Sequence, residues 1–159
     1  MEILLREGKK SDMPSVLELI KELATFENEE DAVEVSVEEL LRDGFGERPS
    51  FKVFIGEIEG KIVGMALFYE RYSTWKGKSI HLEDLIVSDA YRGRGVGKAL
   101  YTKVMEYAHQ RNIKRVSWEV LDWNQVAIDF YESTGAHIVE GWQVVHMNEA
   151  SLNKFVSNT

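Results

Sequence analysis

The sequence predicts a domain of the mixed α/β (α+β) class, built on a mostly antiparallel sheet with flanking helices. Three observations predict it. Strand-like apolar alternation and helix-like periodicity take turns along the chain. Three successive strand patterns favour antiparallel pairing, and a later strand–helix–strand order favours a parallel pair. A chain of 159 residues with 44% apolar content can bury one core, so we expect a single domain over residues 1–159.

The first third of the chain predicts one strand and a helix. Residues 2–7, EILLRE, have the length and composition of a short strand. Residues 11–26 predict a helix that begins at Ser11 as N-cap. Its apolar face follows the helical spacing of Val16, Leu19, Ile20 and Leu23.

A second helix is predicted over residues 36–44. Ser36 and Glu39 form the pattern of a capping box at its start, and Gly44 is a typical end signal. The order up to this point is therefore strand, helix, helix.

The middle of the chain predicts a hairpin and a third strand. FKVFIGEI and KIVGMALFYE flank Glu59 and Gly60, which indicates a tight turn between two strands. Residues 80–87, IHLEDLIV, follow as the next strand. The remaining elements are a helix from about residue 95, a strand over 114–121, a helix over 124–135 and a closing strand over 142–147.

Composition excludes several classes of function. A formal net charge of −8 argues against nucleic acid as a partner and leaves room for a cationic substrate. No apolar run approaches the eighteen or so residues that span a membrane, and the N-terminus lacks a signal-peptide layout. The absence of cysteine excludes disulfides and thiolate chemistry, and the histidines show no metal-ligand spacing. We expect a cytoplasmic protein without a metal.

Residues 92–98, RGRGVGK, lie between a strand and a helix and resemble a cradle for an anion. A dinucleotide fingerprint requires a glycine at position 98, which is lysine. A Walker A loop fails because position 92 is arginine and position 99 is alanine. What remains is a loop whose backbone amides face an anion at a helix start, or a flexible surface turn.

The same loop resembles the pyrophosphate-binding pattern Arg/Gln-x-x-Gly-x-Gly/Ala of the GNAT family of N-acetyltransferases. The resemblance runs from about residue 2 to 147 and is closer within the diamine and thialysine N-acetyltransferase branch. It implies the GNAT fold, in which a mixed, mostly antiparallel sheet contains a splayed central parallel pair. The segments that carry it are 23–27, 40–46, 72–78, 82–87, 120–125 and 130–136.

The resemblance implies acetyl transfer from acetyl-CoA to a primary amine through a tetrahedral intermediate. The pantetheine arm would pair with Leu85, Ile86 and Val87, and Asn124 with Ala127 in the first turn of its helix would hold the other side. Asn124 is alternatively a plain helix cap. The pyrophosphate would bind at Arg92, Gly93, Arg94, Gly95, Val96, Gly97 and Lys98.

Catalysis requires a neutral amine. A lysine-like amine has a pKa near 10.4, so only about one in two thousand is neutral at pH 7. A carboxylate can position the amine and accept its proton. Glu83 and Asp84 lie on the strand before the loop, and strict alternation allows only one to face the site. Glu83 matches the acidic position of the family, and the alternative is a pair of solvated or salt-bridged acids.

Tyr131 occupies the position of the family's general acid, which would protonate the departing thiolate. Its alternative is a packing role, because it forms a helical stripe with Ala127 and Phe130. The oxyanion would require a backbone N–H near Leu85.

The amine pocket is predicted from the resemblance and from charge. Glu27, beside Phe26, matches a substrate-contacting position, although an acidic run is more often a solvated face. Trp75 is expected to wall the pocket by a cation–π contact or to plug a loop. Glu140, and Glu119, which is expected to be buried in an otherwise apolar strand, are candidates for binding a second cationic group.

The substrate and the assembly are also implied by the branch. Residues 73–77, STWKG, resemble the thialysine-type members and lack the aspartate of the polyamine-acetylating ones. We therefore expect thialysine, lysine-like amines or short diamines to be better substrates than spermidine or spermine, and we expect a homodimer. The alternatives are a non-catalytic acyl-CoA-binding module and a protein N-terminal acetyltransferase, both disfavoured by the motifs.

Overall fold

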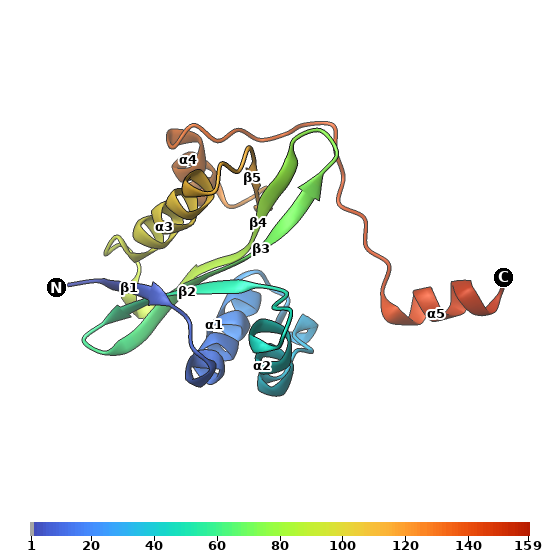
Figure 1. Cartoon of the computed structure of the whole chain (residues 1–159), viewed down its shortest axis with the longest axis horizontal. Coiled ribbons are helices and arrows are strands. Elements are labelled where there is room, and N and C mark those ends of the chain that lie inside the picture. The colour runs from blue at the N-terminus through green and yellow to red at the C-terminus, as the bar shows by residue number, and fades with distance from the viewer. Residues whose placement is uncertain (1) are drawn as a thin grey trace. The chain divides into compact units, whose positions relative to one another are not determined.

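A computed structural model describes residues 2–159 and contains one five-stranded sheet (Figure 1). The strands are adjacent in chain order, antiparallel from the first to the fourth, and the fourth and fifth are parallel. Both predicted pairing types are confirmed. The strands are β1 (Leu4–Glu7), β2 (Lys52–Ile58), β3 (Lys61–Ser73), β4 (Gly77–Val87) and β5 (Val116–Ser117).

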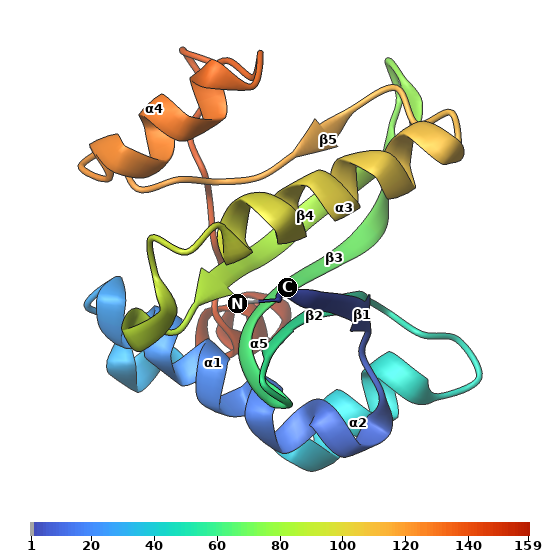
Figure 2. The same cartoon turned by 90° about the vertical axis from the view of Figure 1, so that its left-hand side faces the viewer.

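The chain divides after Glu119 into two compact units, which we describe separately. The first unit holds the whole sheet, and the prediction of one domain stays a prediction. In this unit α1 (Met13–Phe26) and α2 (Val37–Phe45) cover one face of the sheet. The opposite face carries α3 (Val96–Gln110), as Figure 2 shows. Short 3₁₀ turns lie at Lys10–Asp12, Glu30–Ala32 and Asp89–Tyr91.

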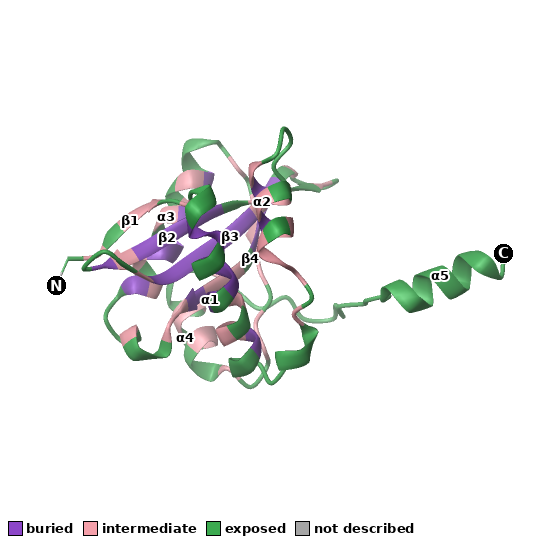
Figure 3. Cartoon of the chain, turned by 90° about the horizontal axis from the view of Figure 1, so that it is seen from below, coloured by how far each residue is buried: buried purple, intermediate pink, exposed green. Residues whose placement is uncertain are grey.

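The buried residues follow the central strands (Figure 3). Between the sheet and the first two helices they form an apolar core of Met13, Val16, Leu17, Leu19, Leu40, Val53, Ile55, Met65, Leu67 and Ile86. Because α1 and α2 are amphipathic, this burial stabilises both helices and the sheet face at once.

Two glycines allow the start of α3 to approach the sheet. Gly56 and Gly64 are cross-strand partners on β2 and β3. A Cβ atom on Gly64 would lie 2.8 Å from the carbonyl oxygen of Ile86, and one on Gly56 would lie 3.0 Å from Cγ1 of Val96. The missing side chains therefore let α3 begin close to the end of β4, which places the glycine loop there.

The helix ends differ from two of the predictions. Ser11 is not an N-cap, because a 3₁₀ turn precedes α1 and Asp12 accepts a 2.7 Å hydrogen bond from the amide of Lys9. Gly44 does not end α2. Its missing side chain instead makes room for the Phe51 ring, which would lie 2.4 Å from a Cβ atom added at Gly44. The helix continues to Phe45.

Two local predictions are confirmed by hydrogen bonds and backbone angles. The capping box of α2 forms, with Ser36 and Glu39 bonded reciprocally at 2.9 and 3.2 Å. The Glu59–Gly60 turn has positive φ at both residues, +51° and +74°, as a tight hairpin turn requires.

An ion-pair network joins β1 and β2 to the 3₁₀ turn before α1. Arg6 donates to both carboxylate oxygens of Asp12, at 2.6 and 3.0 Å, and also to Glu57. Asp12 is buried, and the hydrogen bonds from Arg6 hold the pKa of its carboxyl below the usual range. The network therefore contributes charged cross-links at the edge of the core.

The second unit contains α4 (Gln125–Ser133) and α5 (Glu149–Ser157). Asn124 caps α4 as predicted, and α5 was not predicted. The predicted strand over 142–147 is wrong: no residue there pairs with a strand among the described residues, and its apolar side chains are exposed. Apolar alternation alone does not supply a hydrogen-bonding partner. Among residues 2–159, no helix has the length and apolar character of a membrane span.

Candidate active site

The glycine loop has the backbone geometry of an anion cradle. Gly93 and Gly95 have φ of +73° and +85°, in the left-handed region where a side chain is strained. Gly95 is the N-cap residue of α3, and Ala99 donates the first intrahelical bond to its carbonyl oxygen at 3.0 Å. The backbone amides of Val96, Gly97 and Lys98, the first residues of α3, have no carbonyl oxygen one turn earlier to which they could donate. The positive end of the helix dipole lies at the same amides.

The two arginines of the loop are anchored by the surrounding chain. Arg92 donates to the carbonyl oxygen of Val87 at 3.1 Å and lies over the Phe26 ring, 4.9 Å from its centre. Arg94 donates to the carbonyl oxygen of Ala90 at 3.2 Å. The structure thus brings the predicted substrate residue Phe26 against the predicted cofactor residue Arg92.

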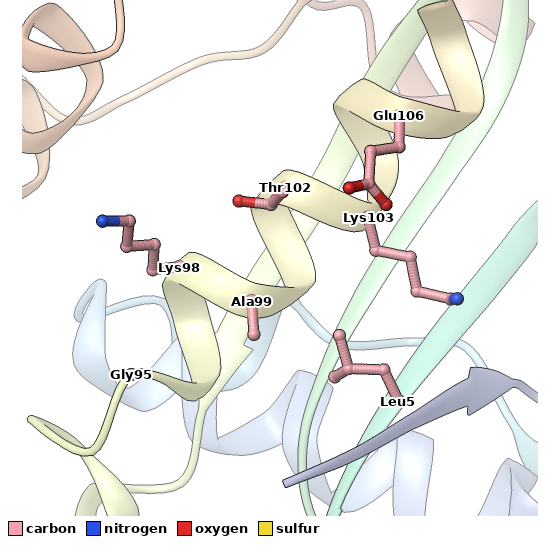
Figure 4. Close-up of a pocket in the computed structure, with 7 residues that line it drawn as sticks. All are labelled: Leu5, Gly95, Lys98, Ala99, Thr102, Lys103 and Glu106. Atoms are coloured by element: carbon pink, nitrogen blue, oxygen red, sulfur yellow. The ribbon is translucent and has the colours of Figure 1, made fainter. Parts of the chain in front are cut away.

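A shallow pocket of about 400 Å³ runs from Gly95 along α3 and is also lined by Leu5 of β1 (Figure 4). Lys98 and Lys103 lie on its rim and point away from each other. The ammonium group of Lys103 lies over the Phe54 ring, 5.1 Å from its centre. Lys98 is therefore the cation of this pocket that belongs with the glycine loop.

The edge of β4 is open beside this loop. Within the described residues β5 pairs with β4 only at Ile80 and His81, so the strand continues to Val87 without a partner on that side. Leu85, Ile86 and Val87 lie in this open stretch, immediately before the loop. The parallel pair therefore splays, and the backbone groups on its open edge have the geometry to bond an extended ligand.

A β-bulge lies at the two acids of β4. Leu67 is paired with Asp84 and Phe68 with Leu82, so Glu83 is an extra residue without a partner of its own. Cross-strand partners share a face, which places Asp84 with Leu67 on the face covered by α1 and α2. The expectation that only one acid can face the site was wrong, because strict alternation does not continue through a bulge.

These acids form a like-charged cluster with the end of α1. Burial, followed by the charges of Glu83 and Glu27, raises the pKa of Asp84 to about 6. Burial and the charge of Glu29 raise the pKa of Glu27 as well. The charges of Glu83, Asp84 and Glu27 are therefore close enough to interact, and together they would attract a cation.

Sequence reasoning missed two side chains that contact Glu83. The hydroxyl of Tyr69 donates to Glu83 Oε2 at 3.0 Å, and burial is the main reason why the pKa of Tyr69 is raised. His81 Nε2 lies 3.6 Å from the same oxygen. The only available signal was the spacing of His81 and Glu83, two residues apart on one predicted strand.

A second shallow pocket, of about 450 Å³, adjoins this cluster through Tyr69. Its lining is mainly apolar, and its acid, Asp43, is paired with Arg42 at 2.7 Å. The pocket is lined by Val35, Asp43, Ser50, Phe51, Leu67 and Tyr69, and it lies between α2 and β3.

Two predicted substrate residues of the first unit lie elsewhere than expected. Trp75 is exposed at the tip of the β3–β4 hairpin, where Ser73 is paired with Gly77. That tip is five residues, or about 17 Å, along the strand from Leu82, so one chain does not bring Trp75 to Glu83. Glu119 is exposed and follows β5, so the prediction that it is buried in a strand was wrong, although its charge acts on Tyr69.

The remaining predicted residues belong to the second unit. Asn124 Oδ1 accepts a 3.3 Å hydrogen bond from the amide of Ala127, and Tyr131 is half-buried with its ring beside Phe130, 5.5 Å between centres. Asn124, Ala127 and Tyr131 thus share one helix and its cap. Glu140 is exposed beyond the helix. No cluster of three metal-ligating acids, histidines or cysteines occurs among residues 2–159.

Comparison with known proteins identifies relatives of the whole chain. The model of the acetyltransferase (GNAT) family matches residues 13–136. A thialysine N-epsilon-acetyltransferase of Bos taurus is 41% identical over 151 residues, which are 88% of this chain and 89% of the relative. A spermidine/spermine N(1)-acetyltransferase-like protein 1 of Homo sapiens is 38% identical over 93% of this chain, but only 23% of that relative is covered.

Solved structures share the fold. An integron cassette protein of V. cholerae superposes with a TM-score of 0.79 at 24% identity, covering 98% of both chains. An acetyltransferase of Trypanosoma brucei superposes with a TM-score of 0.73 at 26% identity, covering 92% of this chain and all of the other.

Proposed function

The chain belongs to the GNAT family of acetyltransferases, and from this premise we propose that it acetylates a primary amine of a small cationic molecule with acetyl-CoA. The observation that carries the proposal is the combination on β4 of an acidic cluster, an open strand edge and a glycine loop. A non-catalytic acyl-CoA-binding module and a protein N-terminal acetyltransferase are less favoured, because the two relatives of similar length with 41% identity are named as thialysine N-epsilon-acetyltransferases.

Acetyl-CoA would supply the acetyl group as a thioester. The amides of the glycine loop, Gly93 to Lys98, would hold its pyrophosphate, with Arg92 and Arg94 adding positive charge. The free edge at Leu85, Ile86 and Val87 would pair with the pantetheine arm, and Asn124 with Ala127 would lie on its other side. The positive φ of Gly95 supports this role, because the main chain there adopts a conformation that side chains disfavour.

Glu83 would accept the proton of the attacking amine. The Tyr69 hydroxyl donates to its Oε2, so the carboxylate is held in one orientation. Asp84, with a pKa of about 6, is ionised at neutral pH and adds negative charge for the ammonium form of the substrate. The amine nitrogen would bond to the acetyl carbon to give a tetrahedral intermediate. As this intermediate collapses, the carbon–sulfur bond would break and Tyr131 would give its proton to the leaving thiolate.

The body of the amine would lie in the pocket beside Tyr69. This pocket is mostly apolar, and its acid is already paired with an arginine, which suits a short aliphatic chain or thioether better than a polycation. Glu27 and Phe26 would lie at the entrance, with Glu119 and Glu140 as further candidates for a distal group. Ser73 supports the same preference, because it stands where an aspartate would attract a distant ammonium.

We further propose a homodimer and retain a cytoplasmic location as a prediction. Exposed apolar side chains support the dimer, because a patch of this kind is typical of an interface. In the second unit they include Trp142, Val144, Val145, Met147, Leu152, Phe155 and Val156. Light scattering at micromolar concentration tests the dimer, and a fully active monomer would contradict it.

The activity is tested with acetyl-CoA and a panel of primary amines by following thiol release. We expect a higher kcat/KM for thialysine, lysine-like amines or short diamines than for spermidine. A clear preference for spermidine would show that the argument from Ser73 was wrong. Release of thiol with peptides alone would favour the N-terminal acetyltransferase instead.

The cofactor loop is tested with Gly95→Asp and the matched Gly95→Asn. Both side chains tolerate positive φ comparatively well, so they differ mainly in charge. We expect the KM for acetyl-CoA to rise much more in the aspartate variant than in the asparagine variant. If both variants fold and neither changes the KM for acetyl-CoA, the loop does not bind the pyrophosphate.

The general acid is tested with Tyr131→Phe, which keeps the ring and removes the hydroxyl. Turnover should fall by roughly 10²–10⁴, the usual contribution of acid catalysis, while the melting temperature is retained. Near-normal turnover would mean that Tyr131 is a packing residue.

A further inference from the structure

The last two turns of α1 contact the segment that leads into the glycine loop. Glu22 and Phe26 lie one helical turn apart, so they share one face of α1. The backbone amide of Asp89 donates a 2.7 Å hydrogen bond to Glu22 Oε1, although 67 residues separate the two in sequence. The guanidinium of Arg92 lies over the Phe26 ring, 4.9 Å from its centre. One face of α1 therefore contacts both ends of the short turn before the loop.

The amide that donates to Glu22 is one that its own turn leaves without an acceptor. Asp89 is the first residue of the 3₁₀ turn Asp89–Tyr91, so its amide has no carbonyl oxygen earlier in the turn to which it could donate. Ser88, the N-cap residue, makes no side-chain cap to this turn within the described chain. A carboxylate acceptor makes such a bond roughly twice as strong as a neutral one. Glu22 thus caps the turn from a distant helix.

Further bonds join this turn to the sheet and to the glycine loop. The amide of Ser88 donates to the carbonyl oxygen of Val63 at 2.8 Å, which continues the pairing of β3 with β4. Arg92 donates to the carbonyl oxygen of Val87 at 3.1 Å, and its Nη1 lies 3.3 Å from Asp89 Oδ1. The glycines of the loop follow directly. The start of the loop therefore depends on a turn that β3 holds on one side and α1 on the other.

The charge of Glu22 does not itself favour an anion at the loop. A carboxylate repels a pyrophosphate group, so charge alone would make Glu22 unfavourable for the binding of acetyl-CoA. A favourable contribution can come only from the hydrogen bond to Asp89. The two effects have opposite signs, and an experiment can separate them.

We propose that Glu22 is a positioning residue that holds the glycine loop in the conformation that binds acetyl-CoA. This role rests on the proposed acetyltransferase function. Without the hydrogen bond, the loop would adopt the binding conformation for a smaller fraction of the time, and the apparent Kd would rise by the inverse of that fraction. Because Glu27 of the acid cluster lies at the end of the same helix, α1 would serve both the amine and the cofactor.

Three variants of α1 test the proposal by titration calorimetry with acetyl-CoA. Glu22→Ala removes the acceptor, and we expect the Kd to rise about 10-fold, the effect of losing one hydrogen bond to a charged group. Glu22→Gln keeps a neutral acceptor, so the Kd should rise only about 3-fold. Glu18→Ala is the matched control, because it removes the same charge one turn earlier at an exposed position, and its Kd should equal that of the wild type. The KM for the amine should not change in any of the three.

Hydrogen exchange gives a readout that does not depend on acetyl-CoA. The amide of Asp89 should be protected in the wild type, because it is bonded to Glu22. Glu22→Ala should lose protection over residues 89–98 while the central strands keep theirs. Unchanged protection of Asp89 in this variant would overturn the anchoring role.

The binding results can also overturn the proposal. An unchanged Kd in Glu22→Ala would show that the loop does not need the anchor, and a lower Kd in both Glu22 variants would show that repulsion outweighs the hydrogen bond. A fall in melting temperature without a change in Kd would mean that the bond stabilises the fold in general. Wild-type protein that does not bind acetyl-CoA would instead overturn the proposed function, and hydrogen exchange would then still show whether Glu22 anchors the turn.

Discussion

Asp12 and Asp84 are aspartates of the same unit, and the structure shifts their pKa values in opposite directions. Asp12 is buried beside Arg6, whose hydrogen bonds lower its pKa and outweigh the effect of burial. Asp84 is half-buried, and the charges that act on it, Glu83 and Glu27, are negative like its own. The first carboxylate has its cation within the chain, and the charges that shift the pKa of the second are those of two other acids.

The comparison separates structural acids from functional ones without reference to any relative. Burial alone raises the pKa of a carboxyl group, so the sign of the shift depends on the neighbours. A cluster of acids with a raised pKa next to an open strand edge is more typical of a functional site than of a structural ion pair. Four predictions test this distinction, in order of decreasing effect.

The largest effect is expected on catalysis. Glu83→Gln should lower kcat/KM by roughly 10²–10⁴, because the proton acceptor is lost, while the melting temperature changes little. Thiol release with acetyl-CoA and an amine measures it. Asp12→Asn is the matched control, and an equal loss of activity per folded molecule there would break the comparison.

A smaller effect, on stability, is expected from the paired acid. Arg6→Ala leaves Asp12 without its cation and should lower the free energy of unfolding by about 3 kcal/mol at pH 7. Because the pKa of Asp12 is lowered, this contribution is present above the ordinary aspartate pKa and is lost as the pH falls below it. Urea unfolding at several pH values measures both. Arg42→Ala, which removes the exposed pair with Asp43, should have little effect.

The stability contribution of Asp84 should depend on pH in the opposite direction to that of Asp12. The pKa of Asp84 is raised from 3.8 to about 6 in the folded chain. The stabilisation that the protonated carboxyl gives the fold is therefore fully present below the pKa of the unfolded chain, and it is lost as the pH rises through 6. Asp84→Asn should therefore increase the free energy of unfolding by roughly 2 kcal/mol at pH 7 and have little effect at pH 4. The variant should also lose the decline in amine kcat/KM below about pH 6 that we expect of the wild type. Destabilisation at pH 7 would contradict the assignment.

The smallest effect concerns Glu27. Glu27→Gln should lower the pKa of Asp84 by only a fraction of a unit, since burial and Glu83 act on it more strongly. Carboxyl-carbon NMR titration would measure the change, with Glu18→Gln, an exposed acid on α1, as control. An unchanged Asp84 titration would place Glu27 outside the cluster.

Local signals predicted much of the fold and the place of the glycine loop between β4 and α3. The capping box at Ser36, the Glu59–Gly60 turn and the Asn124 cap depend on residues close in sequence, so their patterns were sufficient. The strand expected over 142–147 failed because a strand requires a partner that its own sequence does not specify. Contacts of Tyr69 and His81 with Glu83 depend on cross-strand register, and a bulge shifts that register by one residue.

The bulge at Glu83 also determines how the length of this chain can vary. Deleting Glu83 itself would leave the pairs from Asp84 to Val87 in place, but an insertion or deletion after it would turn every later side chain of β4 to the opposite face. The open edge at 85–87 would then be out of phase with the loop and with α3, although the composition would hardly change. Single-residue insertions and deletions should accordingly be tolerated at the exposed tip around Trp75 and rejected between Asp84 and Val87. In a set of length variants, the folded ones should therefore be those that keep the register of β4 with β3.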